Sequence, residues 1–339
     1  MMFQFIETLP GDANFHLFET LPSALYGADR LRLQQSDSIN TEFLHTCIVL
    51  LNNEKEAIAR LAIYNNPALY YQEQKAACIG NFECINDNAA AKALIEYASN
   101  RIQTDLKSPF TIGPMNGSTW DNYRFSNHHN NPNIFLEPDH HLYYNDLFLA
   151  CGFQAISTYK SALDKQLQFD NPAIAMREQE LLATGVVFTN IDLMNFEGEL
   201  EKIFELSLSA FEKNFLYTPI SWETFKKKYL EASKIMHPEH VILAEDQAKN
   251  CIGFMFCIDD LYNKSEKSLI VKTVARINKK EWSGLGNVLG NMITRRAAKE
   301  GYASMIHAFM IEEAFSNKLS SNFLGEVYKN YTLFGKSTK

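Results

Sequence analysis

The sequence lacks several features that mark whole classes of protein. No uninterrupted apolar run reaches about 18 residues, which excludes a predicted membrane-spanning helix. The six cysteines form no C-x-x-C pair, so we expect free thiols in a reducing compartment. Lysine and arginine number 32 against 40 aspartates and glutamates, a net charge of −8. Unselective attraction to nucleic acid or to anionic lipid is therefore weak, and neither is expected as a partner.

The composition that is present fits a folded protein of two domains. The chain has 339 residues, and domains average about 150 residues. Hydrophobic residues make up 46% and charged residues 21%, as in ordinary globular proteins. Near the N-terminus there is no basic stretch, and Glu7 and Asp12 precede any long apolar run. We therefore expect no secretory signal peptide and a cytoplasmic location.

One order of predicted elements occurs twice. In the C-terminal half, a strand near 186–193 precedes helices, a β-hairpin over 240–258 and a strand at 268–277. A glycine turn, a helix ending at Gly301, a strand, a helix and a last strand near 328–336 follow. The N-terminal half predicts the same order and ends on a strand near 153–163, with Asn88 as a predicted helix N-cap.

This repetition predicts the fold class and the division of the chain. We expect an α/β (α+β) protein of two similar domains, each a mixed, mainly antiparallel sheet flanked by helices. The predicted domains are residues 1–165 and 186–339, and residues 166–185 form a linker that carries a helix. The two halves share no detectable residue-level repeat, so their similarity is one of pattern.

The turn KKEWSGLGNVLG, residues 279–290, carries the most informative chemistry. One interpretation is an ordinary strand-to-helix turn. The other is an anion-binding loop, in which Gly284 and Gly286 allow close approach of a ligand and the helix N-terminus supplies N–H groups. The turn matches neither the P-loop pattern nor G-x-G-x-x-G, since residue 289 is leucine.

In this context the segment resembles the GCN5-related N-acetyltransferase superfamily. Residues 281–286 match the cofactor loop [Q/R]-x-x-G-x-[G/A] of that family, except that Glu281 replaces the first residue. The resemblance implies two acyl-CoA N-acyltransferase-like domains, with acetyl-CoA or another acyl-CoA as cosubstrate. It implies that the cosubstrate binds along Lys272, Thr273, Val274 and Ala275 and on Trp282, Ser283, Gly284, Leu285, Gly286 and Asn287. The equivalent N-terminal segment, NDNAAAKAL, has no glycine, which implies a degenerate copy.

The polar loop from Gly113 to Asn145 is too long for a simple connection. Its mixture of aromatic and polar residues is typical of a small-molecule pocket, and an irregular surface layer is the alternative. The loop also contains GPMNGSTWDNYR, which resembles a segment of tandem acetyltransferase-like proteins. The predicted acceptor-binding residues are Asn116, Trp120, Tyr123 and Arg124. The loop's four histidines have no metal-ligand spacing, so we predict no metal site.

Acetyl transfer to an amine needs a base for the ammonium proton and an acid for the departing thiolate. The tyrosine that usually serves as the acid in this family is replaced at about Ser321, and an asparagine near the start of that helix is replaced by Ala314. We therefore consider Tyr328 and Tyr331 as acids. His307 and Glu245 are the candidate bases, although His307 also fits a purely structural role.

The sequence as a whole predicts an acyl-CoA-dependent N-acetyltransferase. The expected acceptor is a small amine or an amino-acid derivative, with no nucleic-acid or membrane partner. Two alternatives stay open: a non-catalytic acyl-CoA-binding protein, and an aminoacyl or fatty-acyl transferase on the same tandem fold.

Overall fold

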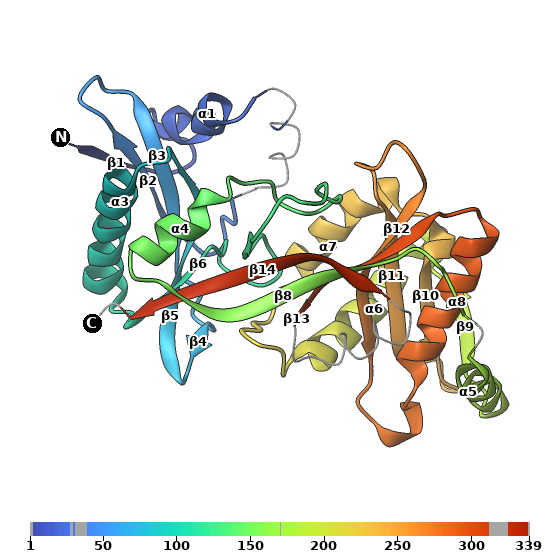
Figure 1. The fold of residues 1–339 in the computed structure, drawn as a ribbon. Coiled ribbons are helices and arrows are strands. Elements are labelled where there is room, and N and C mark those ends of the chain that lie inside the picture. The colour runs from blue at the N-terminus through green and yellow to red at the C-terminus, as the bar shows by residue number, and fades with distance from the viewer. Residues whose placement is uncertain (1–2, 28–29, 31–38, 170, 312–324, 338–339) are drawn as a thin grey trace. The chain divides into compact units, whose positions relative to one another are not determined.

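The computed structural model describes residues 3–27, 30, 39–169, 171–311 and 325–337. These residues form two units (Figure 1). Unit 1 comprises the chain up to Thr158, the segment Leu216–Thr218 and the residues from Asn330 onward. Unit 2 comprises Tyr159–Phe215 and Pro219–Lys329.

The sheet of unit 1 has six main strands in the order β1-β2-β3-β5-β6-β14. Neighbouring strands are antiparallel, except for the parallel pair β5 and β6. The short strand β4 pairs with β5, and β7 pairs with β14. The bounds are β1 Gln4–Thr8, β2 Leu44–Leu51, β3 Ala57–Tyr64, β4 Tyr70–Tyr71, β5 Gln74–Cys84, β6 Phe110–Gly113, β7 Phe125–Ser126 and β14 Glu326–Ser337.

Helices α1 (Phe15–Leu25), α3 (Asn88–Arg101) and α4 (Tyr143–Ala150) accompany this sheet, and a short π-helix, η1 (Ile102–Leu106), extends α3. Apolar residues of α3 recur at helical spacing, and Leu94 and Ile95 are fully buried in a core that includes Ile79 of β5. Strands β2 and β3 form the hairpin that the repeated order of elements predicted for the N-terminal half.

The sheet of unit 2 follows the same plan in the order β9-β10-β11-β12-β13-β8. Its parallel pair is β12 and β13, and its other neighbours are antiparallel. The bounds are β8 Gln154–Asp164, β9 Val187–Asn190, β10 Val241–Glu245, β11 Cys251–Asp259, β12 Ser268–Arg276 and β13 Ser304–Ile311.

Helices cover both faces of the unit 2 sheet. Side chains alternate between the two faces along each strand, and in β11 the side chains on both faces are apolar. Met255 and Cys257 of β11 lie in the core cluster that includes apolar residues of α5 and α8. Phe254 and Phe256 of the same strand line a cavity together with residues of α6 and α7. The bounds are α5 Pro172–Ala183, α6 Phe196–Phe211, α7 Trp222–Ala232 and α8 Leu285–Lys299, with short 3₁₀ turns at Leu193–Asn195, Ser233–Ile235, Pro238–His240 and Lys280–Trp282.

The sixth strand of each sheet comes from the other half of the sequence. The last strand, β14, pairs with β6 of unit 1, and its Phe334 packs in the unit 1 core. From Tyr159 onward, β8 pairs with β13 of unit 2. We expected each strand to close the sheet of its own half, with a boundary at residue 165, and here the structure differs. Apolar periodicity identifies a strand but contains no information about its pairing partner.

Candidate functional site

In unit 2, strands β12 and β13 separate partway along their length. Their parallel pairing covers four residues on each strand and ends where Val271 faces His307. Beyond this point β12 continues to Arg276 and stays paired with β11, while β13 turns away through a register shift after His307. Among the described strands, none pairs with β12 on its β13 side after Val271. The backbone of Lys272–Ala275 therefore lies at the opening between the two strands.

The open part of β12 leads into the glycine loop, which we define as residues 281–287. Gly284 has a φ of +83° and occupies the N-cap position of α8, so the N-cap residue has no side chain that could accept from the N–H groups of the first turn. Leu285 and Gly286 are buried, whereas Ser283 is exposed and Gly284 and Asn287 are half-buried. A helix N-terminus has unsatisfied donors and a partial positive charge. The loop can therefore accept an anionic group.

An arginine missed in the sequence analysis lies on this loop. Arg177 of α5 donates from Nε to the carbonyl oxygen of Ser283 (2.9 Å) and from Nη2 to that of Glu281. Its Nη1 pairs with Glu180 at 2.8 Å. Arg177, Lys280, Glu281, Ser283 and Gly284 line one open depression. A linker helix without a motif gave no signal that could have identified this residue.

The equivalent positions in unit 1 are filled by the protein itself. The N-cap of α3 is Asp87, rather than the predicted Asn88, and its carboxylate accepts from the N–H groups of Ala89 (2.7 Å) and Ala90 (2.9 Å). This carboxylate occupies the donors that a phosphate would need.

The opening between β5 and β6 in unit 1 is also filled. Their parallel pairing ends at Cys78, and the next part of β5 bonds to the following loop. The N–H of Met115 donates to the carbonyl of Ile79 (2.9 Å), and Oδ1 of Asn116 accepts from the N–H of Asn81 (3.0 Å). A Cβ on Gly80 would lie 2.3 Å from Asn116 Oδ1, which leaves no room for another ligand.

His307, a predicted base, lies on β13 where β12 and β13 separate. It is 7% exposed, and burial lowers its pKa from 6.5 to about 4. The imidazole is therefore neutral at pH 7 and is a weak proton acceptor. This pKa fits the structural role that we considered beside the catalytic one.

Glu245, the other predicted base, ends β10 and is engaged in a charge cluster. The Lys202 ammonium lies 2.6 Å from Glu245 Oε1 and 2.8 Å from Glu199 Oε1. Hydrogen bonds to Glu199 and Glu245 raise the pKa of Lys202. Glu245 would have to release this ammonium before it could accept a proton.

The two candidate acids belong to different units. Tyr328 lies on the part of β14 that belongs to unit 2, together with the glycine loop. Tyr331 belongs to unit 1, where it pairs with Ser126 of β7 and is 2% exposed. The sequence analysis assigned both to the C-terminal domain, so the exchange of β14 corrects the placement of Tyr331. Ser321 and Ala314 lie outside the described residues.

All four predicted acceptor-binding residues are in unit 1. Asn116 is part of the filled opening, and Trp120 donates from Nε1 to the carbonyl of Thr218 (2.9 Å). The guanidinium of Arg124 lies 4.1 Å from the ring centre of Tyr123 and 5.7 Å from that of Tyr331. The structure thus brings Tyr123 and Arg124 together with one predicted acid.

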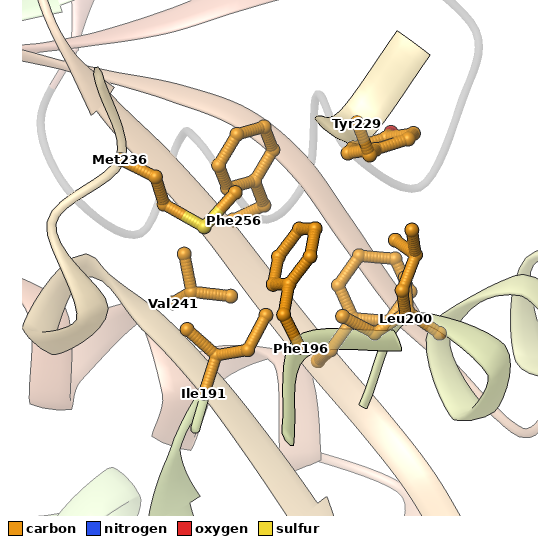
Figure 2. A pocket seen from close by; sticks show the side chains of 9 residues that line it. Ile191, Phe196, Leu200, Tyr229, Met236, Val241 and Phe256 are labelled. Atoms are coloured by element: carbon orange, nitrogen blue, oxygen red, sulfur yellow. The ribbon is translucent and has the colours of Figure 1, made fainter. Parts of the chain in front are cut away.

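Unit 2 also has an apolar cavity against one face of its sheet. The labelled side chains in Figure 2, among them Phe196, Tyr229 and Phe256, surround it. Its free volume is about 10 Å³, at most enough for one water molecule. The cavity is therefore a packing gap and cannot hold an acceptor in this conformation. The lining residues are Ile191, Phe196, Leu200, Ile203, Tyr229, Met236, Val241, Phe254 and Phe256.

No group of three or more histidine, cysteine, aspartate or glutamate side chains in the described part of the chain is arranged to hold a metal ion. None of the described helices combines the length and apolarity needed to cross a bilayer.

Comparison with solved structures found whole-chain matches. The first is a GCN5-related glucosamine N-acetyltransferase region in a fungal multi-domain β-N-acetylglucosaminidase, with a TM-score of 0.61, 11% identity, and coverage of 99% of this chain but 38% of that one. The second is a GCN5-related N-acetyltransferase from Sphaerobacter thermophilus, with a TM-score of 0.55, 11% identity, and coverage of 99% and 96%. A tandem GNAT protein from the clavulanic acid biosynthesis pathway gives a TM-score of 0.54, 9% identity, and coverage of 100% and 99%.

Comparisons with protein-family models and with curated sequences found no match. The low identities to the solved structures establish the fold and leave the substrate open. Because the matches span both units, the chain has the tandem fold of the GCN5-related N-acetyltransferases, as the resemblance of its glycine loop implied.

Proposed function

We propose that this chain is an acyl-CoA-dependent N-acyltransferase and that unit 2 binds the acyl-CoA. The observation that carries this proposal is the contrast between the units. In unit 2 no described strand pairs with β12 on its β13 side after Val271, and β12 leads to a helix whose N-cap is a glycine, whereas in unit 1 Asp87 and Asn116 fill both equivalent positions. A pantetheine arm has amide groups that suit a strand edge, and its phosphates suit a helix N-terminus.

The residues proposed to hold acyl-CoA are those on β12 and in the glycine loop. Backbone groups of Lys272, Thr273, Val274 and Ala275 would bond the pantetheine amides, and the loop from Trp282 to Asn287 would bond the phosphates. Bound acyl-CoA supplies an acyl group that is activated as a thioester. The chain's own task is to orient that thioester beside an amine and to move one proton from the amine to the thiolate.

For this proton transfer we propose Tyr328 as the acid, because it shares unit 2 with the glycine loop. A tyrosine hydroxyl can donate to a thiolate as the carbon–sulfur bond breaks. Neither candidate base is ready for its role at pH 7, because His307 has a depressed pKa and Glu245 is paired with Lys202. Deprotonation of the amine in solution before binding would remove the need for a strong base.

The acceptor in our proposal is a small amine, and Tyr123 and Arg124 of unit 1 remain the proposed contacts. A guanidinium can hold a carboxylate with two parallel hydrogen bonds, which favours an amino-acid derivative over a simple polyamine. One structural neighbour is a glucosamine N-acetyltransferase region, so an amino sugar also belongs among the amines to be tested.

A second candidate is a non-catalytic acyl-CoA-binding protein. It is favoured by the same two observations on His307 and Glu245, since neither side chain offers an available base near neutral pH. The cosubstrate residues would be identical in this case.

The experiment measures binding and transfer separately on the full-length chain. Calorimetry with acetyl-CoA and longer acyl-CoA esters measures affinity, and thiol release measures transfer to amino acids, polyamines and amino sugars. Acyl-chain preference would identify a fatty-acyl transferase. Binding without transfer to any amine would support the second candidate. Absence of binding by every acyl-CoA would overturn the proposed function.

A further inference from the structure

Helix α5 lies outside the order of elements that the two units share, yet it contacts the glycine loop directly. Its Arg177 donates to two loop carbonyls, those of Glu281 and Ser283. The aliphatic part of the same side chain packs on Gly284, where an added Cβ would lie 3.2 Å from Arg177 Cγ. One half-buried side chain therefore touches three residues of the loop.

We propose that Arg177 is the positioning residue of the glycine loop. Its two hydrogen bonds hold the carbonyls of Glu281 and Ser283, so that the N–H groups at the start of α8 face the phosphates of acyl-CoA. This inference rests on the proposed function, because the phosphate-bearing ligand is the acyl-CoA of that proposal.

The fork shape of the guanidinium is what suits Arg177 to this role. Five N–H donors in one plane allow it to bond two carbonyls and Glu180 at once, which the single ammonium of lysine cannot reproduce. Arg177 also places a positive charge beside Glu281, the acidic residue at the first position of the loop motif. Lys279 and Lys280 flank the same position, with Lys279 Nζ 3.9 Å from Glu281 Oε1.

The chain offers a matched control on the same pair of helices. Arg295 of α8 donates from Nη2 to both carboxylate oxygens of Glu178 on α5, at 2.8 and 2.9 Å. Removal of Arg295 breaks a contact between α5 and α8 without removing any bond to the glycine loop. A general loosening of the two helices would therefore affect both arginine variants.

The experiment compares Arg177→Ala, Arg177→Lys and Arg295→Ala with the wild-type chain. We expect Arg177→Ala to weaken acetyl-CoA binding about tenfold, or about 1.4 kcal/mol, and Arg177→Lys to restore it only in part. Arg295→Ala should stay within about twofold. S-acetylpantetheine, which lacks the phosphates, should bind the wild type and Arg177→Ala within about twofold of each other. Acetyl-CoA KM should rise in Arg177→Ala while kcat is retained.

Hydrogen exchange without ligand tests the effect on the loop independently. Amides of residues 281–289 should exchange faster in Arg177→Ala than in the wild type or in Arg295→Ala. Unchanged acetyl-CoA affinity in Arg177→Ala, or equal weakening in Arg295→Ala, would overturn the inference. Equal weakening of S-acetylpantetheine would overturn the link to the phosphates. If the wild type bound no acyl-CoA, both the proposed function and the role of Arg177 in ligand binding would be overturned. Faster amide exchange in Arg177→Ala would in that case show only that Arg177 orders the loop.

Discussion

The substitution Gly284→Asp tests the site most directly. Gly284 caps α8 with a φ of +83°, and an added Cβ would lie 3.2 Å from Arg177 Cγ. The new carboxylate would stand at the start of α8, where a phosphate is proposed to bind. It would reproduce in unit 2 the anionic cap that Asp87 already provides for α3 in unit 1.

The expected magnitude follows from the interactions that the carboxylate would replace. A hydrogen bond to a charged group contributes about 1.5–3 kcal/mol, and like-charge repulsion adds to its loss. A total near 3 kcal/mol corresponds to a Kd about 100-fold higher. At a ligand concentration of about 100 times the wild-type Kd, stabilisation by acetyl-CoA should fall from about 2.7 to about 0.4 kcal/mol.

The assay is thermal or urea unfolding with and without acetyl-CoA, and Gly301→Asp is the matched control. Gly301 follows the same helix with a φ of +77° and has no heavy atom within 4 Å of an added Cβ. Both variants should lose about 1 kcal/mol or more of intrinsic stability through the left-handed conformation. Only Gly284→Asp should lose the ligand-dependent gain. An undiminished gain in Gly284→Asp would refute the assignment of the loop.

Three other predictions address the remaining features. Burial holds the pKa of His307 near 4, below its ordinary 6.5, so the unfolded chain binds the proton more strongly than the folded chain. About 3 kcal/mol of folding stability should therefore be lost as pH falls from 6.5 to 4. Urea unfolding should show a flatter dependence of stability on pH for His307→Leu than for the wild type, and parallel profiles would contradict the assignment. Gly80→Ala should destabilise the protein by about 3 kcal/mol, because the new Cβ would clash with the backbone of Met115 and the side chain of Asn116. Gly27→Ala is the control and should be nearly neutral, because no heavy atom lies within 4 Å of its added Cβ. Equal melting temperatures of the two variants would refute the filled opening in unit 1. Tyr123→Ala and Arg124→Ala should raise the acceptor KM and leave acetyl-CoA affinity within about twofold. Arg124→Lys should lose activity only with acceptors that carry a carboxylate. Unaltered kinetics in all three variants would show that the acceptor binds elsewhere.

The exchange of β8 and β14 determines how these experiments are designed. A fragment ending at residue 165 would lack β14, the strand that pairs with β6 and carries Phe334 into the unit 1 core. It would also carry the part of β8 that pairs with β13 in unit 2. Absence of acyl-CoA binding by unit 1 is therefore tested on the full chain, with variants of the glycine loop.

Local physical chemistry explains what the sequence by itself determined. Apolar spacing predicted most of the strands and helices of both units, including β12 and α8 but neither β4 nor β7, and the helix predicted between the last two strands lies outside the described residues. Residue 284 has a positive φ, a backbone conformation that glycine adopts more easily than any residue with a side chain. This preference depends only on the local backbone, so it can be recognised in the sequence. The repeated order of elements predicted two similar domains, and the resemblance of the glycine loop to the family motif implied the tandem fold.

The tertiary structure decided the features that depend on residues far apart in the sequence. Arg177 reaches carbonyls more than 100 residues away, and β14 pairs with a strand more than 200 residues earlier. The depressed pKa of His307 arises from burial, which no motif encodes. Such contacts form where packing brings distant segments together. The spacing of apolar residues shows which face of a helix or strand is buried, but it does not show which other segment packs against that face.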